Sequence, residues 1–196
     1  MEKLNDLIPI PAKEVMNKGL SAASENTMLE ILGKPGELTS DCSDPNNVFI
    51  KKLVFGVDVG PFKVSGLFYA VESLKQIFDQ IKIELPEVYN EIKTAGVLCI
   101  RSRRHNPSKY SNHSWGSAID IYFGSGVVEQ GIHQTHRGIY LLYQYFNNHG
   151  WYWGAEFSGD SVDSMHFELA EETISKIGIV PEFVSKTNRK KKPKLV

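Results

Sequence analysis

The chain has 196 residues, of which 41% are hydrophobic and 23% are charged, so it can bury one sizeable core and is too short for two full domains. A formal net charge of -1 argues against a protein that binds nucleic acid over its whole surface. The apolar runs fall short of the length needed to cross a bilayer, so we expect no membrane span.

The first residues do not resemble a secretory signal. Residues 1–11 contain two acids and two prolines, where such a signal needs a basic start and an unbroken apolar stretch. We therefore expect synthesis in the cytoplasm, and any site of action outside the cell would require cell lysis or another delivery route.

Residues 1–47 are rich in turn formers, and we expect them to form an extension packed on a main domain of residues 48–184. The extension contains one short predicted helix, near Ser24 to Leu32. Ser24 is a suitable N-cap for this helix, and Gly33 is a suitable stop.

A longer amphipathic helix is predicted from Leu67 onward, because apolar residues recur there at helical spacing. These residues are Leu67, Val71, Leu74, Phe78 and Ile81. Pro86 ends this helix or starts the next turn. The apolar run Val97 to Ile100 then predicts a short central strand, which leads into a basic loop at residues 101–107.

The next predicted strand covers Ala118 to Phe123. Side chains alternate between the two faces of a strand, so Ile119 and Ile121 should enter the core while Asp120 points to an open face. This strand would therefore present one carboxylate toward a possible site.

The remaining elements are a helix over Thr135 to Asn148 that stops at Gly150, an extended segment at Trp151 to Trp153, and a strand at His166 to Leu169. In the last strand, alternation places His166 and Glu168 on one face. This order of helices and strands predicts a single α+β domain with a small antiparallel sheet flanked by helices.

Two cysteines do not make a disulfide framework. Cys99 lies in an apolar run, so we expect a buried, reduced thiol, with a single bridge to Cys42 as the alternative. Neither cysteine has a partner at metal-binding spacing, and both are left out of the predicted metal site.

The last eleven residues carry six positive charges, which leaves a net charge of -7 on the rest of the chain. We expect residues 185–196 to form a disordered, solvated tail that an anionic polymer could attract. A nuclear or nucleic-acid-binding protein is an alternative that rests on this tail alone, and we expect no nucleic-acid partner.

Two histidines and one aspartate predict a catalytic zinc site. His113 lies in a loop rich in Ser, Asn and Gly, Asp120 follows on a strand, and His166 lies on the last strand. Two imidazoles and one carboxylate give one Zn²⁺ three protein ligands and leave the fourth tetrahedral position for water, as in catalytic sites.

Asp163, three residues before His166, is a candidate general base for that water. The alternative for Asp163 is a turn or capping residue. Arg101 and Arg104 are candidates to bind a substrate carboxylate or a developing oxyanion, whereas a solvated position is expected for Arg103.

Three further residues, Ser111, Trp115 and Trp153, are candidates for contacts with the substrate. Tryptophans of this kind more often belong to the core or the wall of a cleft, but one that borders the metal could shape a substrate groove.

Together these residues resemble the VanY-type family of zinc D-alanyl-D-alanine carboxypeptidases and L-alanyl-D-glutamate endopeptidases. The family pattern Ser-x-His-x-x-Gly-x-Ala-x-Asp is matched at Ser111, His113, Gly116, Ala118 and Asp120. Its second part, Trp-Gly followed by Asp-x-x-His-Phe-Glu, is matched at Trp153, Gly154, Asp163, His166, Phe167 and Glu168. The resemblance covers residues 65–170, and the two patterns together are more specific than either alone.

The resemblance implies the hedgehog/DD-peptidase fold, one zinc ion on His113, Asp120 and His166, and Asp163 as catalytic base. It also implies that Arg101 or Arg104 supports substrate binding, and that the substrates are peptidoglycan stem peptides. Asp163 and the Trp-Gly stretch are more like the endopeptidase branch. A phage-type lysin, an effector with an immunity protein or delivery apparatus as partner, and a wall-recycling enzyme all fit this resemblance.

A non-catalytic zinc module is the alternative from another functional class, because the hedgehog signalling domain is similar in fold and uses such a site for binding. Asp163 favours the enzyme, since a module that only binds needs no base beside the metal.

Overall fold

The computed structural model describes residues 2–179 and confirms the predicted α+β class with an antiparallel sheet. The central sheet has the strand order β4-β7-β10-β9, with all neighbours antiparallel. Its strands are β4 (Lys93–Gly96), β7 (Ala118–Tyr122), β10 (His166–Leu169) and β9 (Trp151–Trp153). The predicted tail at residues 185–196 lies outside the described residues.

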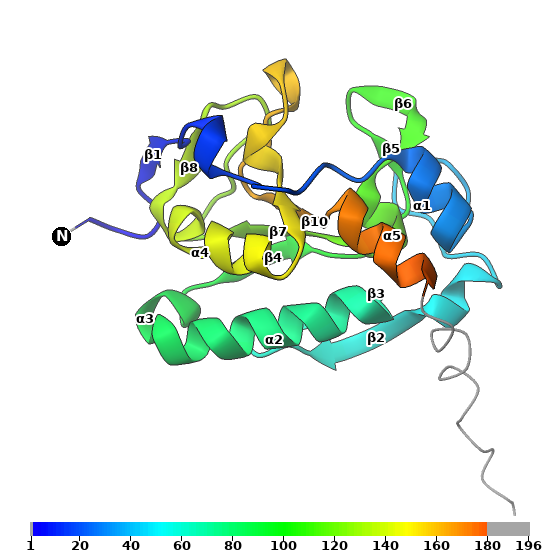
Figure 1. Ribbon diagram of the computed structural model, residues 1–196, viewed down its shortest axis with the longest axis horizontal. Helices are drawn as coiled ribbons and strands as arrows, with labels where there is room; N and C mark the ends of the chain where they lie inside the picture. Colours follow the sequence, from blue (N-terminus) through cyan, green and yellow to red (C-terminus); the bar gives the residue numbers. More distant parts are fainter. Residues whose placement is uncertain (1, 180–196) are drawn as a thin grey trace, which may run out of the picture.

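Helices flank the sheet: α1 (Glu25–Leu32), α2 (Phe68–Glu84), α3 (Pro86–Tyr89), α4 (Arg137–Asn148) and α5 (Glu171–Ile179). Helix α2 runs along one face of the sheet (Figure 1). Its buried residues are Ala70, Val71, Ser73, Leu74, Ile77, Phe78 and Ile81. No helix within residues 2–179 has the length and apolar character required to span a membrane.

Three two-stranded sheets surround this core. They are β1 (Leu7–Pro9) with β8 (Gln134–His136), β2 (Leu53–Asp58) with β3 (Lys63–Leu67), and β5 (Ser102–Arg103) with β6 (Asn106–Tyr110). Short 3-10 helices connect these elements: η1 (Lys13–Val15), η2 (Phe49–Lys52), η3 (Asn112–Trp115), η4 (Gly154–Glu156) and η5 (Gly159–Ser161). The β5–β6 hairpin and the segment with η5 stand on the side of the sheet opposite α2 (Figure 1).

Local sequence signals determine the helix boundaries. Ser24 caps α1, because its hydroxyl accepts a hydrogen bond from the backbone N–H of Thr27 at 3.1 Å. Pro86 opens α3, where its missing N–H costs nothing. The helix predicted from Thr135 begins two residues later, at Arg137, because residues 134–136 pair with β1 instead.

The strand predicted at Val97 to Ile100 is wrong. The strand is β4, which lies at the edge of the sheet and ends at Gly96, whose φ of 120° turns the chain out of the sheet. Val97 and Ile100 are nevertheless buried. The apolar run therefore reflects burial beneath the site rather than extended pairing.

The expectation of a reduced Cys99 is also wrong, because Cys42 and Cys99 form a disulfide. An isolated antiparallel bridge between Ser43 and Ile100 brings the two segments together, and the Cα atoms of the cysteines lie 5.0 Å apart. The disulfide thus links the N-terminal region to the segment that carries Arg101.

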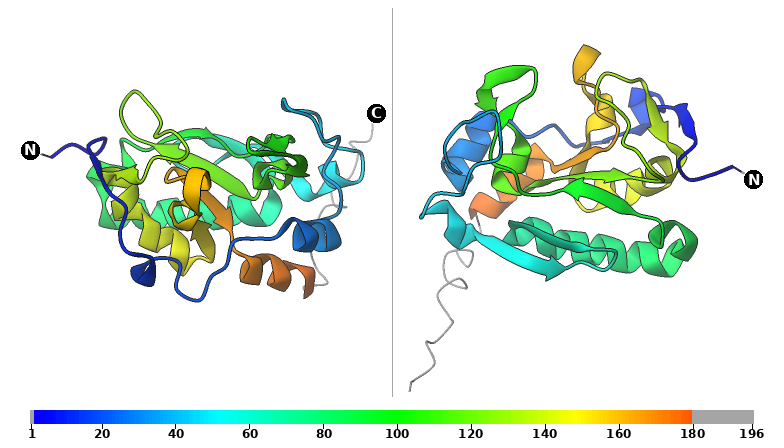
Figure 2. Two further views of the ribbon diagram at one scale, coloured as in Figure 1. Left: turned by 90° about the horizontal axis from the view of Figure 1, so that it is seen from above. Right: turned by 180° about the vertical axis from the view of Figure 1, so that it is seen from behind.

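We call residues 17–24 the N-terminal strap. This strap runs along the molecule from η1 to α1, and α1 lies beside α5 (Figures 1 and 2). Asn17 anchors it: its side-chain oxygen accepts from Trp153 N at 2.7 Å and its amide nitrogen donates to Trp153 O at 3.0 Å. The Asn17 amide therefore satisfies the open edge of β9 as a neighbouring strand would. The domain boundary at residue 47 stays a prediction.

The disulfide should stabilise the fold, because it closes a loop between residues 57 positions apart in the sequence. Replacing both Cys42 and Cys99 with Ala should lower the free energy of unfolding by about 2–4 kcal/mol, measured by chemical denaturation. A reducing agent should have the same effect on the native chain and none on the double variant. A native chain unaffected by reduction would contradict the assignment.

Candidate metal centre

The pairing of β7 with β10 brings two of the predicted ligands together. In its register, His166 lies directly opposite Asp120. Ile119 and Phe167, which flank them, are fully buried in the core, so alternation directs Asp120 and His166 to the other face.

His113 reaches the same point from η3, which a left-handed Gly116 with a φ of 61° terminates. The carbonyl of Gly116 accepts from Leu67 N at 3.0 Å, and a Cβ at Gly116 would lie only 2.6 Å from the Cα of Gly66. Only glycine fits both the φ angle and this close approach. The glycine of the first motif therefore holds the turn that carries His113.

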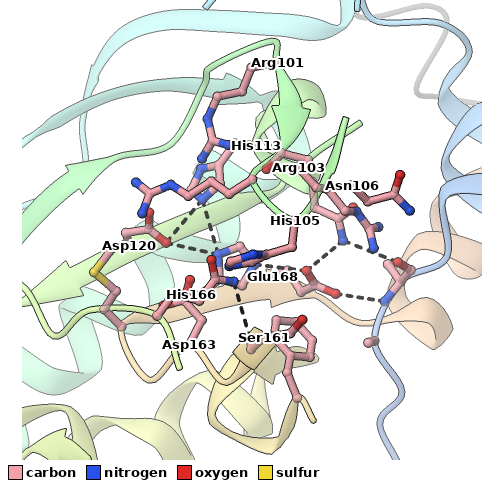
Figure 3. Close-up of a pocket in the computed structure, with 18 of the residues that line it drawn as sticks. Arg101, Arg103, His105, Asn106, His113, Asp120, Ser161, Asp163, His166 and Glu168 are labelled. Carbon is pink, nitrogen blue, oxygen red and sulfur yellow. Dashed lines mark hydrogen bonds and ion pairs between the residues drawn. The ribbon is translucent and has the colours of Figure 1, made fainter. Parts of the chain in front are cut away.

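The side chains of His113, Asp120 and His166 point toward one another (Figure 3). The Nε2 atom of His113 lies 3.2 Å from both Asp120 Oδ1 and His166 Nδ1, and the latter two atoms lie 3.0 Å apart. A tetrahedral zinc site with ligand distances of about 2.0–2.1 Å has edges of about 3.3 Å. The cluster therefore has nearly the dimensions of one face of such a site.

The outward nitrogens of both imidazoles already have acceptors. His113 Nδ1 donates to the carbonyl of Val97 at 2.9 Å, and His166 Nε2 donates to Glu168 at 3.0 Å. In a neutral imidazole the other nitrogen then carries a lone pair. Two imidazole nitrogens and a carboxylate oxygen thus face one another, and one shared cation would satisfy all three.

The charge balance of the cluster agrees with this requirement. Burial disfavours the ionised form of Asp120, but His113 and His166 outweigh it and hold the pKa of its carboxyl well below the usual range. Burial likewise disfavours a charged His166, yet the hydrogen bonds that the carboxylates of Asp120 and Glu168 accept from it raise its pKa well above the usual value. The cluster therefore stabilises positive charge.

The cluster lies in a pocket of about 500 Å³. The β5–β6 hairpin and the residues before it supply the pocket with Arg101, Arg103, Arg104 and His105. Two of these guanidinium groups are held by the backbone: Arg101 Nη1 donates to Ser102 O at 3.0 Å and Arg103 Nε donates to Tyr110 O at 2.9 Å. Positive groups therefore form one side of a pocket that contains the cluster.

Asp163 lines the same pocket, close to His166 (Figure 3). Its backbone N–H donates to Gly154 O at 3.0 Å, which fixes the turn before β10. Its Oδ1 atom is buried and has no hydrogen-bond partner among the described residues. Burial raises the pKa of the Asp163 carboxyl, with His166 opposing and Asp120 adding to this rise. No hydrogen bond of a capping residue is made by this side chain among the described residues, and the residue lines the pocket that contains the cluster.

Two predicted substrate contacts need correction. Trp115 and Trp153 are fully buried and do not line the pocket. Their indole N–H groups donate to Gly33 O and Ser164 O, each at 2.8 Å, so both side chains belong to the core. Ser111 does line the pocket, and its role as a substrate contact stays a prediction.

Other residues of the pocket were not predicted from the sequence. Arg103, expected to be solvated, lines it together with His105 from the hairpin turn. Glu168 also lines it, and alternation along the last strand had already placed this residue on the face of His166. Ala22 and Ala23 of the strap complete one wall, and the sequence carried no local signal for them.

Comparison with known families agrees with the geometry. Residues 104–169 match the family model described as D-alanyl-D-alanine carboxypeptidase, so the predicted resemblance is confirmed for this part of the chain. The matched segment contains the whole cluster together with Arg104 and Asp163, but not Arg101. Comparisons with curated proteins and with solved structures found no match.

We expect the cluster to bind one divalent metal ion per chain, measured by titrating metal-free protein with Zn²⁺ or Co²⁺. Replacing His166 with Ala should abolish saturable binding in the same concentration range, because only two ligands remain. His133→Ala is the matched control, since His133 is exposed and lies outside the cluster. Equal binding by both variants would exclude the cluster as the metal site.

Proposed function

We propose that the protein is a zinc-dependent peptidase that hydrolyses an amide bond in peptidoglycan stem peptides. The observation that carries this proposal is the buried, unpartnered carboxylate oxygen of Asp163 in the same pocket as the three converging ligand atoms. The family match over residues 104–169 supports the reaction class and the kind of substrate.

The donor set favours zinc over harder cations. Two imidazole nitrogens and one carboxylate oxygen are the ligands of catalytic zinc sites, whereas Mg²⁺ and Ca²⁺ prefer oxygen alone. When bound, zinc supplies Lewis acidity, which polarises a carbonyl group and brings the pKa of water down to about 7.

Asp163 is positioned to act as the base. As a carboxylate, Asp163 can accept a proton from the attacking water, and the resulting acid can donate that proton to the leaving amine. The backbone hydrogen bond to Gly154 and the proximity of His166 hold this side chain beside the cluster. Both proton transfers thus use one residue that already faces the pocket.

The arginines provide the positive charge that a substrate with free carboxylates requires. Stem peptides contain free carboxylates, and a guanidinium group binds a carboxylate with two parallel hydrogen bonds. Arg101 and Arg104 line the pocket on the side of the hairpin, and Arg103 joins them. We propose that these residues orient the substrate by a carboxylate group or stabilise the oxyanion that develops at the scissile bond.

A peptidase of this kind would meet its substrate at the cell wall. We therefore propose the cell wall as its site of action. If the protein is an effector, we propose an immunity protein or a delivery apparatus as its partner.

Asp163→Asn should reduce the rate of stem-peptide hydrolysis by about 10²–10⁴-fold, because the amide cannot accept the proton. Zinc binding should be unchanged, since Asp163 is not part of the ligand cluster. The measurement is mass spectrometry of muropeptide digests, and the mass of the released fragment identifies the bond. A lost terminal D-alanine would indicate a carboxypeptidase, and an internal cut an endopeptidase.

Asp160→Asn is the matched control, because Asp160 is exposed on η5 and does not line the pocket. Hydrolysis by the native chain should also stop when a chelator removes the metal. Tight, saturable binding of muropeptides with no hydrolysis by the zinc-loaded native chain would instead establish the non-catalytic module.

A further inference from the structure

The carboxylate of Glu168 is buried behind the metal cluster, with only 3% of the residue exposed. Three donors converge on it: His166 Nε2 at 3.0 Å, Asn112 Nδ2 at 2.7 Å and the backbone N–H of Ala23 at 3.0 Å. Its two oxygens are thus shared among a cluster residue, the η3 segment that carries His113, and the N-terminal strap.

This environment suits only a carboxylate. The Oε2 atom accepts from both His166 and Asn112, and the Oε1 atom accepts from Ala23. An ionised carboxylate accepts at both oxygens and donates at neither. A glutamine would place its NH₂ group against at least one of these donors in either orientation of the amide.

We propose that Glu168 is a positioning residue that selects the nitrogen through which His166 binds the metal. By accepting from Nε2, Glu168 keeps the proton on that nitrogen and turns Nδ1 toward Asp120 and His113. Such carboxylate–histidine pairs fix both the tautomer and the ring orientation of a metal ligand. His113 has the opposite arrangement, with Nδ1 on the Val97 carbonyl and Nε2 toward the cluster.

The same carboxylate connects the N-terminal strap to the cluster. The amide of Asn112 also donates to Ala23 O at 3.4 Å, so Ala23 is held through both its N–H and its carbonyl. The strap is also attached at points that do not involve His166, and one of these is the hydrogen bond that the Ser21 N–H donates to Glu172 at 2.9 Å. These two attachments allow the role of Glu168 to be separated from simple anchoring of the strap.

The inference rests on the proposed metal site and is tested with the full chain. Glu168→Gln preserves the size of the side chain but removes an acceptor, and Glu172→Gln is the matched control that weakens the strap alone. Metal affinity is measured by competition between each protein and a chromophoric chelator for Zn²⁺ and Co²⁺. We expect Glu168→Gln to bind about 10–100-fold more weakly than the native chain, with the control close to native.

The tautomer of His166 provides a second readout that does not depend on activity or on a variant that folds. Long-range ¹H–¹⁵N correlation spectra of the native, zinc-loaded chain should show the metal on Nδ1 and the proton on Nε2. A native His166 that binds zinc through Nε2 would overturn the inference, since Glu168 would then not select the nitrogen.

The outcomes separate this inference from the proposed function. If the native chain binds no zinc and cleaves no stem peptide, the proposed function fails and the inference falls with it. If the native chain binds zinc and cleaves, but Glu168→Gln has the affinity of Glu172→Gln, only the positioning role is wrong. Weaker binding by Glu168→Gln alone, with zinc on Nδ1 of native His166, supports the proposal.

Discussion

The site depends on three lone pairs held about 3 Å apart in a buried position, an arrangement that is unfavourable unless a cation lies among them. The rest of the fold keeps these atoms from separating. The β7–β10 register fixes Asp120 opposite His166, and the left-handed turn at Gly116 brings His113 to the same point. Helix α2 packs along one face of the sheet that carries two of these ligands (Figure 1).

In each imidazole, the ring nitrogen that faces away from the cluster donates to a different kind of acceptor. The Val97 carbonyl holds His113 and is available because the chain leaves the sheet after Gly96, which frees the backbone from strand pairing. A side-chain carboxylate, Glu168, holds His166. Glu168 also accepts a hydrogen bond from the backbone N–H of Ala23 in the strap. The N-terminal extension is therefore part of the support of the site.

Periodicity predicted the parts of the site that local pattern determines. Alternation along two short strands placed Asp120 and His166 on one face, and the helix boundary at Ser24 followed from capping. The prediction of a strand at residues 97–100 was wrong, because a buried loop and a buried strand have the same apolar composition. The prediction that Trp115 and Trp153 contact the substrate did not hold, because a motif position does not reveal the direction of a side chain. The disulfide and the contact of Ala23 with Glu168 join distant segments, which local sequence cannot indicate.

The role of Asp163 as a base requires two opposing effects to balance. Burial raises the pKa of its carboxyl, and a protonated Asp163 could not accept a proton from water. A divalent cation at the neighbouring cluster favours the ionised form, as does Arg104, whose charge lowers this pKa. Burial thus keeps the base strong, while the metal and the arginine keep it ionised. The proposed metal site and Arg104 act on the same carboxylate, so under the proposed function metal binding would also favour the form of Asp163 that accepts a proton.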